Sequence, residues 1–189
     1  MLAHPQQRGV PTLFFIPFLL LRHPPHLIFP LKKERFLKSF RFFRKDFLYD
    51  RSLIKEQKSL DKYYCIDNGL RGAVLIPQSN DNGKNLENTV FMLLNRNRHP
   101  FDKISYYQGN CECDFVMQRE ENIMQLIQVT WSMADDETRE REIKGLLEAA
   151  AVTACNNLLI ITNDEKGELV KNGKTIKIMP AWKWLTKGE

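Results

Sequence analysis

The chain has 189 residues, of which 43% are hydrophobic and 27% charged, and its formal net charge is +5. This composition is ordinary for a globular chain and excludes collagen, disorder throughout and a disulfide-rich scaffold. The charge is uneven: residues 1–50 hold nine Lys/Arg against three Asp/Glu, whereas residues 51–189 hold 19 against 20. The basic character that would indicate an anionic partner therefore belongs to the N-terminal segment.

The N-terminal segment, residues 1–48, allows more than one interpretation. Residues 12–21 are apolar but too few to span a bilayer, and no small-residue cleavage site follows, so we expect a cytoplasmic rather than a secreted chain. In residues 31–48, Leu and Phe recur every three to five positions among Lys and Arg, which predicts a basic amphipathic helix. Such a helix suits an anionic membrane or a partner. Alternatively, the Phe/Pro/His/Arg bias indicates a non-native segment read from another frame.

The remainder of the chain alternates strand and helix patterns. Strands are predicted at residues 62–66, 104–108, 111–118, 123–131, 157–162 and 175–180. Helices are predicted at 86–98 and 137–154, and turns at 67–69, 120–122, 163–167 and 172–173. This order is typical of an α/β fold. We expect residues 49–85 to be a linker with the first strand, and residues 86–189 to be the core.

Four cysteines are present: Cys65, Cys111, Cys113 and Cys155. An even number is compatible with two disulfides in a secreted protein. Cys113 and Cys155 lie in apolar periodic segments, where cysteine packs as a small hydrophobic residue, so we favour reduced thiols. A metal site built on the Cys111/Cys113 pair would need two further ligands at matching spacing, and the sequence offers none.

Polar side chains on two neighbouring strands form a candidate site. Glu112 and Asp114 share one face of their strand, and Gln128 and Thr130 share one face of the next. If these strands pair, the two sets converge, and Glu87 in the preceding helix joins them. Oxygen ligands of this kind suit Mg²⁺, which activates water and stabilises the leaving oxygen of a phosphodiester.

Several strings in this chain resemble one known family. They are, in order, YYCIDNGLRG, NLENTVFMLLNR, CECDFVM, LIQVTW, ETREREIKGL, NLLIITNDE and IMPAWKWL. Together they resemble the domain of unknown function 4143, which is found at the C-terminal end of bacterial and archaeal AAA-type ATPases. The resemblance spans residues 50–189. It implies a restriction-endonuclease-like core of the PD-(D/E)XK type, with a mixed sheet flanked by helices.

The resemblance also assigns roles to individual residues. Glu87 matches the helix glutamate of the nuclease pattern, Asp114 matches the strand aspartate, and Gln128 matches the second acidic position. Thr130 stands where the pattern has a lysine, which would position the attacking water and offset charge on the phosphate. Threonine carries no charge, so cutting would need a migrated cation such as Lys144 or Arg141. The implied Mg²⁺-dependent nuclease site is therefore degenerate.

The ATPase half of the family has no counterpart in this sequence. There is no G-x-x-x-x-G-K-[ST] loop, so we expect no ATP binding by this chain. The family-like sequence begins near residues 49–57, just where the unusual composition ends. That coincidence is typical of a truncated or frameshifted gene.

Three functions follow from these features. The first is a non-catalytic module that binds protein or nucleic acid, the second a Mg²⁺-dependent nuclease, and the third a membrane-associated protein acting through its N-terminus. Thr130 favours the first over the second. The near-neutral charge of residues 51–189 weakens nucleic-acid binding, because phosphate contacts require dense Lys and Arg. The candidate phosphate contacts are Arg139, Arg141 and Lys144. We expect Trp131, Trp182 and Trp184 to pack in the core or at the surface rather than to stack on bases.

Overall fold

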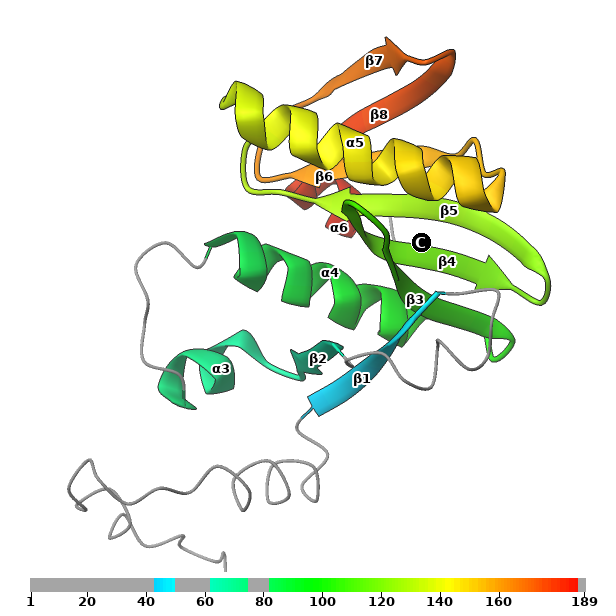
Figure 1. The fold of residues 1–189 in the computed structure, drawn as a ribbon. Helices are drawn as coiled ribbons and strands as arrows, with labels where there is room; N and C mark the ends of the chain where they lie inside the picture. Colours follow the sequence, from blue (N-terminus) through cyan, green and yellow to red (C-terminus); the bar gives the residue numbers. More distant parts are fainter. Residues whose placement is uncertain (1–42, 50–61, 75–81, 187–189) are drawn as a thin grey trace, which may run out of the picture.

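The computed structural model describes residues 43–49, 62–74 and 82–186 (Figure 1). Within these ranges the strands are β1 (Phe43–Leu48), β2 (Lys62–Cys65), β3 (Asp102–Gln108), β4 (Glu112–Arg119), β5 (Asn122–Val129), β6 (Leu158–Thr162), β7 (Gly167–Lys171) and β8 (Lys174–Pro180). The helices are α3 (Asn68–Val74), α4 (Asn82–Asn97), α5 (Asp136–Thr153) and α6 (Ala181–Thr186).

The strands form one mixed sheet in the order β2-β1-β3-β4-β5-β6-β8-β7. Strands β3, β4 and β5 follow one another as antiparallel neighbours, whereas β5, β6 and β8 run parallel. A parallel pair needs a long crossover, and α5 supplies it between β5 and β6. The predicted α/β class, a mixed sheet flanked by helices, is confirmed.

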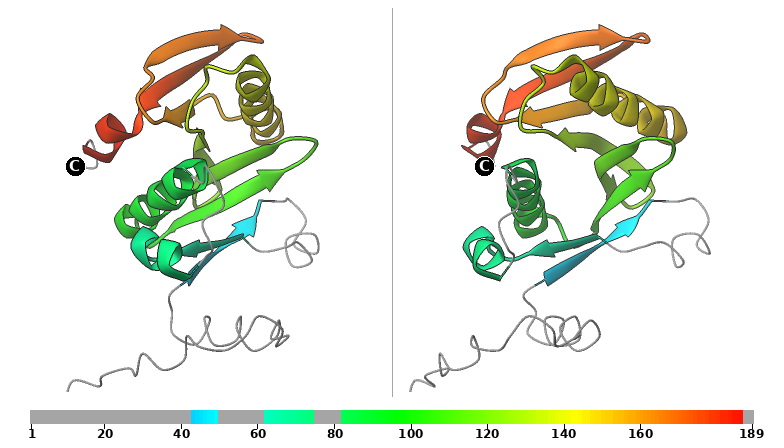
Figure 2. Two further views of the ribbon diagram at one scale, coloured as in Figure 1. Left: turned by 90° about the vertical axis from the view of Figure 1, so that its left-hand side faces the viewer. Right: turned by 60° about the vertical axis from the view of Figure 1, so that its left-hand side comes forward.

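Helices cover the two faces of the sheet separately, with α5 on one face and α3, α4 and α6 on the other (Figures 1 and 2). Each face has its own apolar core. Leu126 of β5 packs with Leu146 in the α5-side core, while its neighbour Ile127 packs with Val90 and Phe91 in the α4-side core. This alternation follows from side chains pointing to opposite faces along a strand, and it divides the polar residues of β4 and β5 in the same way.

Helix α5 has clear sequence reasons for its position. It begins where the Asp135 carboxylate accepts a hydrogen bond from the Thr138 N–H at 2.7 Å, and it ends at Ala154, whose φ of 57° is left-handed. At Gly145 the helix lies directly against the Glu112 carbonyl of β4, where an added Cβ would overlap that oxygen. Glycine is therefore required for α5 to lie this close to the strand that carries the candidate site.

The helix predicted over residues 31–48 is wrong from Phe43 onward, because Phe43–Leu48 forms β1; residues 31–42 lie outside the described part. Strand β1 pairs antiparallel with β2 and parallel with β3, and the Tyr49 N–H donates to the Tyr106 carbonyl at 2.6 Å. The spacing of Phe43 and Phe47 suits a helical stripe, but hydrogen bonding to two strands outweighs such a local pattern. The sheet thus extends across the predicted boundary at residue 48.

Three smaller elements also differ from prediction. The predicted turn at Asp67 begins α3, because the Asp67 carboxylate accepts the Leu70 N–H at 2.7 Å and caps the helix. The C-terminal aromatic stretch forms α6, and the unpredicted β7 pairs with β8 at the edge of the sheet. The predicted turn at Asn172-Gly173 is confirmed, with φ values of 54° and 71° that suit a two-residue hairpin.

Candidate functional site

A bulge in β4 directs the central residue of the candidate site. Between two ladder positions, Ser105 opposite Val116 and Tyr107 opposite Cys113, β3 advances by two residues and β4 by three. The extra residue of β4 changes the alternation, so that Cys113 and Val116 join the α5-side core while Phe115 joins the α4-side core. As a result the Asp114 side chain, only 6% exposed, turns toward α4.

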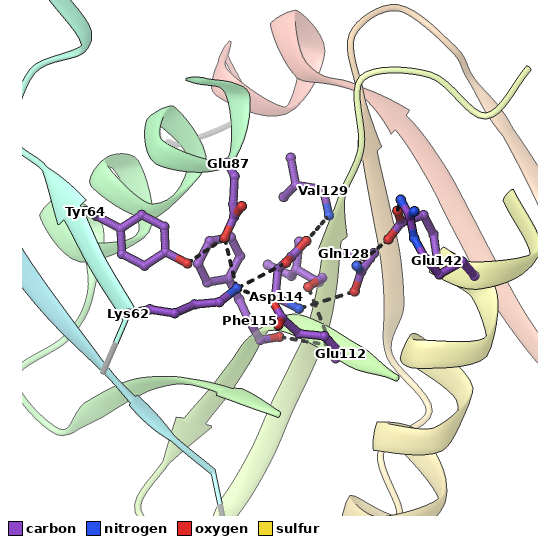
Figure 3. A network of polar contacts seen from close by, with 12 residues as sticks. Lys62, Tyr64, Glu87, Glu112, Asp114, Phe115, Gln128, Val129 and Glu142 are labelled. Carbon is purple, nitrogen blue, oxygen red and sulfur yellow. Dashed lines mark hydrogen bonds and ion pairs between the residues drawn. The ribbon is translucent and has the colours of Figure 1, made fainter. Parts of the chain in front are cut away.

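The ammonium of Lys62 lies at the centre of three carboxylates (Figure 3). Its Nζ is 3.2 Å from Oε1 of Glu87 on α4 and 3.5 Å from Oδ1 of Asp114 on β4, and it donates a hydrogen bond to Glu112. Lys62 itself comes from β2, so the contacts join three elements that are distant in sequence. We call these four residues the Lys62 cluster.

Neighbouring groups fix the carboxylates of the Lys62 cluster. The Tyr64 hydroxyl donates to Glu87 Oε1 at 2.7 Å, and the Tyr64 ring stacks on Phe91 with centroids 4.0 Å apart. The other oxygen of Asp114, Oδ2, accepts the Val129 N–H of β5 at 2.8 Å. Both carboxylates are therefore held by protein groups independently of the ammonium, and their positions are set before any ligand arrives.

The charges of the Lys62 cluster are unequal, with three carboxylates around one ammonium. Burial is the largest cause that raises the pKa of Asp114 well above its ordinary value; Glu87 raises it further and Lys62 opposes the shift. Burial by itself lowers the pKa of Lys62, but Glu87, Asp114 and Glu112 together outweigh it and raise that pKa. Lys62 is consequently charged at neutral pH, and Asp114 holds its proton to a higher pH than an ordinary aspartate.

The structure brings Glu87 and Asp114 together but separates Gln128 from their carboxylates. The Gln128 carbonyl oxygen accepts the backbone N–H of Asp114 at 3.2 Å, while its amide donates to Glu142 of α5 at 2.5 Å. Glu142 in turn accepts from Arg141 at 2.6 Å. Gln128 thus belongs to a chain of hydrogen bonds on the α5 face, opposite the side toward which Asp114 points.

Thr130 lies two residues after Gln128, so its side chain points to the same face of the sheet, and it is also buried. Its hydroxyl donates to the Ser132 carbonyl at 3.3 Å. The position that the nuclease pattern gives to a lysine therefore holds a neutral group engaged with its own backbone. The predicted convergence of Thr130 with the carboxylates does not appear among its contacts.

The candidate phosphate contacts all lie on α5, away from the Lys62 cluster. Arg139 forms an ion pair with Asp136, Arg141 pairs with Glu142, and Lys144 is exposed. Neither predicted substitute for the missing lysine, Lys144 or Arg141, forms an ion pair or hydrogen bond with Asp114; Arg141 pairs with Glu142, and Asp114 only adds to the causes that raise the pKa of Arg141. The cation beside the carboxylates is Lys62, which sequence reasoning missed; its one signal was a lysine alternating with Tyr64 in an otherwise apolar strand.

A divalent metal does not fit the Lys62 cluster as it stands. Magnesium binds carboxylate oxygens at about 2.0–2.1 Å and keeps several waters, but the space between these oxygens is taken by the ammonium. In the described ranges, no group of three or more His, Cys, Asp or Glu side chains is arranged to hold a metal ion. All four cysteines lie in these ranges and are free thiols.

No family model, curated protein or solved structure matches this chain. The resemblance to the domain of unknown function 4143 therefore stays a prediction. Among the described residues, no helix combines the length and apolar character needed to cross a membrane.

Proposed function

We propose that this chain carries a restriction-endonuclease-like domain that does not cut nucleic acid and serves to bind a protein partner. The observation that carries the proposal is the state of the two cationic positions. Thr130 supplies no charge at the position of the pattern's lysine, and Lys62 is shared among three carboxylates. A nuclease needs a cation that contacts the attacking water or the phosphate, and Lys62 already donates to protein oxygens.

A protein partner is favoured over nucleic acid by the charges of α5. Arg139 and Arg141 form ion pairs within the helix, which reduces their availability to phosphates. Trp131 and Trp182 are 42% and 62% exposed, and each lies two residues beyond the C-terminal end of a parallel strand, β5 or β8. Exposed aromatic residues at one end of a sheet are typical of protein interfaces, where Trp is enriched.

Cleavage assays test the catalytic half of the proposal. The full chain is incubated with single-stranded, duplex and branched DNA in Mg²⁺ or Mn²⁺, next to Asp114→Asn as the matched control. We expect no cleavage above that control. Metal-dependent cleavage that disappears in Asp114→Asn would overturn the proposal.

Restoring the missing lysine tests the geometry of β5. In the nuclease pattern, a lysine at position 130 would restore cutting. In this structure, however, Thr130 and Gln128 face α5, away from the Asp114 carboxylate. We therefore expect Thr130→Lys to stay silent in the same assay. Activity in this variant would mean that the new lysine reaches the carboxylates after all.

Binding assays test the choice of partner. Fluorescence anisotropy with labelled single-stranded and duplex DNA is measured for the native chain and for Arg139→Ala/Arg141→Ala. We expect no saturation at micromolar protein in either case. Tight, salt-dependent binding that weakens about tenfold in the double variant would favour nucleic acid instead.

One observation favours a second candidate, a metal-dependent nuclease that uses Lys62 in place of the residue at position 130. The Lys62 Nζ lies within 3.5 Å of Asp114 Oδ1, close enough to contact a substrate bound there. This function predicts metal-dependent cleavage that is lost equally in Lys62→Met and Asp114→Asn. The membrane-associated alternative depends mainly on residues outside the described part and stays a prediction.

A further inference from the structure

The Lys62 cluster contains both the carboxylates that could bind a cation and a cation from the chain itself, the Lys62 ammonium. Three carboxylates from α4 and β4 converge on one point, and the group at that point is the ammonium from β2. Lys62 and Glu87 are about three-quarters buried and Asp114 is almost fully buried, whereas Glu112 is 37% exposed. The contacts are therefore internal to the fold and differ from the solvent-exposed pairs that stabilise proteins little.

The two kinds of cation make different demands on these oxygens. A divalent ion requires unprotonated carboxylates drawn in to about 2.0–2.1 Å, whereas an ammonium donates up to three hydrogen bonds at longer distances. The 3.2 Å distance between Nζ and Glu87 Oε1 is that of a hydrogen bond. The Glu87 and Asp114 oxygens, 3.2 and 3.5 Å from Nζ, thus lie farther from this point than metal ligands would. A divalent ion and the ammonium cannot share the point, because their charges repel.

We propose that the Lys62 ammonium takes the place of the divalent cation that a nuclease-like fold would hold between Glu87 and Asp114. This inference rests on the proposed non-catalytic function and gives it a structural cause. The native chain binds no divalent ion at this point, and the cluster serves to join β2 to α4 and β4. Removing the charge of Lys62 lets the three carboxylates draw in around a divalent ion, an arrangement that they do not have in the native chain.

The test uses MnCl₂ as the probe and the full chain as the protein. Binding is measured by calorimetry and by the Mn²⁺ electron paramagnetic resonance signal for the native chain, Lys62→Met and Lys62→Met/Asp114→Asn. Methionine keeps an apolar stem of similar length and removes the charge. Lys177→Met, an exposed lysine of β8, is the matched control.

The expected result is a gain of metal binding in one variant only. The native chain and Lys177→Met show no saturation below about 1 mM Mn²⁺, the range of weak sites. Lys62→Met binds at least about tenfold more tightly than the native chain, and the double variant loses this gain. A folded Lys62→Met that binds Mn²⁺ no better than the native chain overturns the inference.

A second measurement does not depend on the folding of any variant. Mn²⁺ broadens amide signals close to its binding site, so the backbone amides of residues 112–115 and 129 report on the cluster in the native chain. We expect no selective broadening of these amides at sub-millimolar Mn²⁺. Selective broadening there would mean that a metal binds beside Lys62, which overturns the inference.

The outcomes also separate this inference from the proposed function. If Lys62→Met folds without gaining metal and the native chain does not cut DNA, the inference fails and the non-catalytic function stands. If the native chain binds Mn²⁺ at the cluster and cuts DNA, both fail. If it binds Mn²⁺ at the cluster without cutting, only the inference fails.

Discussion

The two faces of the sheet handle buried polar groups in different ways. On the α4 face, Asp114 and two other carboxylates share one ammonium, and negative charge is in excess. On the α5 face, Gln128, Glu142 and Arg141 form a linear chain in which donors and acceptors match and the exposed Arg141 ends at solvent. The two networks meet at Asp114, whose backbone N–H belongs to one and whose side chain belongs to the other. The comparison shows that three carboxylates can lie close together inside this fold because the positive charge of Lys62 offsets part of their negative charge.

The largest loss of stability is expected at Gly145, where α5 lies against the backbone of β4. Gly145→Ala places a Cβ against the Glu112 carbonyl, so that α5 must move away from β4. We expect a loss of about 3 kcal/mol in the free energy of unfolding, as is typical of overpacking at a rigid backbone contact. Urea unfolding measures it. A loss below about 0.5 kcal/mol would mean that α5 shifts without cost; Gly83→Ala, where an added Cβ meets nothing within 4 Å, is the control.

The next effect concerns the α4 face alone. Lys62→Met leaves three carboxylates without a cation, and we expect a loss of about 2 kcal/mol, below the range for a fully buried pair because the site is partly open. Adding Glu112→Gln should recover part of the loss, whereas Lys177→Met should cost little. Equal stability of Lys62→Met and the native chain would show that the cluster needs no compensation.

The pH dependence of the same variant follows from the raised pKa of Lys62. A group whose pKa is raised by folding contributes stability that is complete below its ordinary value of 10.5 and is lost as pH rises through the folded value. The stability that the Lys62 charge contributes should therefore be lost as pH rises above about 10. Because Lys62 opposes the raised pKa of Asp114, the difference between the native chain and Lys62→Met should also shrink as pH falls and Asp114 becomes protonated in both chains. A difference that does not decrease above pH 10 would contradict the role of the Lys62 charge.

A smaller effect is expected on the α5 face. Glu142→Gln keeps an acceptor for the Gln128 amide but removes the charge opposite the largely exposed Arg141, and we expect a loss of about 1 kcal/mol. Glu142→Ala, which leaves the buried amide without its acceptor, should cost more. Thermal unfolding of both variants measures the difference. The reverse order would show that the ion pair matters more than the hydrogen bond.

The smallest effect calibrates an ion pair outside both networks. Arg119 donates to Asp102 at 2.6 and 3.1 Å, and these hydrogen bonds lower the pKa of Asp102 to about 2. A lowered pKa contributes stability above the ordinary value of 3.8 that is lost as pH falls through about 2. Asp102→Asn should therefore cost under about 1 kcal/mol at pH 7. Its stability deficit should shrink between pH 4 and 2; an unchanged deficit would contradict the role of the carboxylate charge.

Local patterns predicted most of the described elements. Helices α4 and α5 and strands β2, β3, β4, β5, β6 and β8 lie within a few residues of their predicted bounds, because each carries a clear helical or strand pattern of apolar residues. The elements that the sequence did not predict are β1, β7, α3 and α6. In β1 the spacing of Phe43 and Phe47 fits a helix equally well, and only pairing with β2 and β3 decides between the two.

For the candidate site, the sequence by itself determined the residue types and their strands. Strand alternation and the order of the elements predicted that Glu87 and Asp114 meet, whereas the uncharged position at Thr130 was implied by the family resemblance. The sequence could not predict Lys62, which is 25 residues from Glu87 and 50 from Glu112 along the chain. Only the tertiary structure decided that contact and the separation of Gln128 from the carboxylates. The physical reason is the one-residue bulge in β4 together with the pairing of β2, which set the side-chain directions.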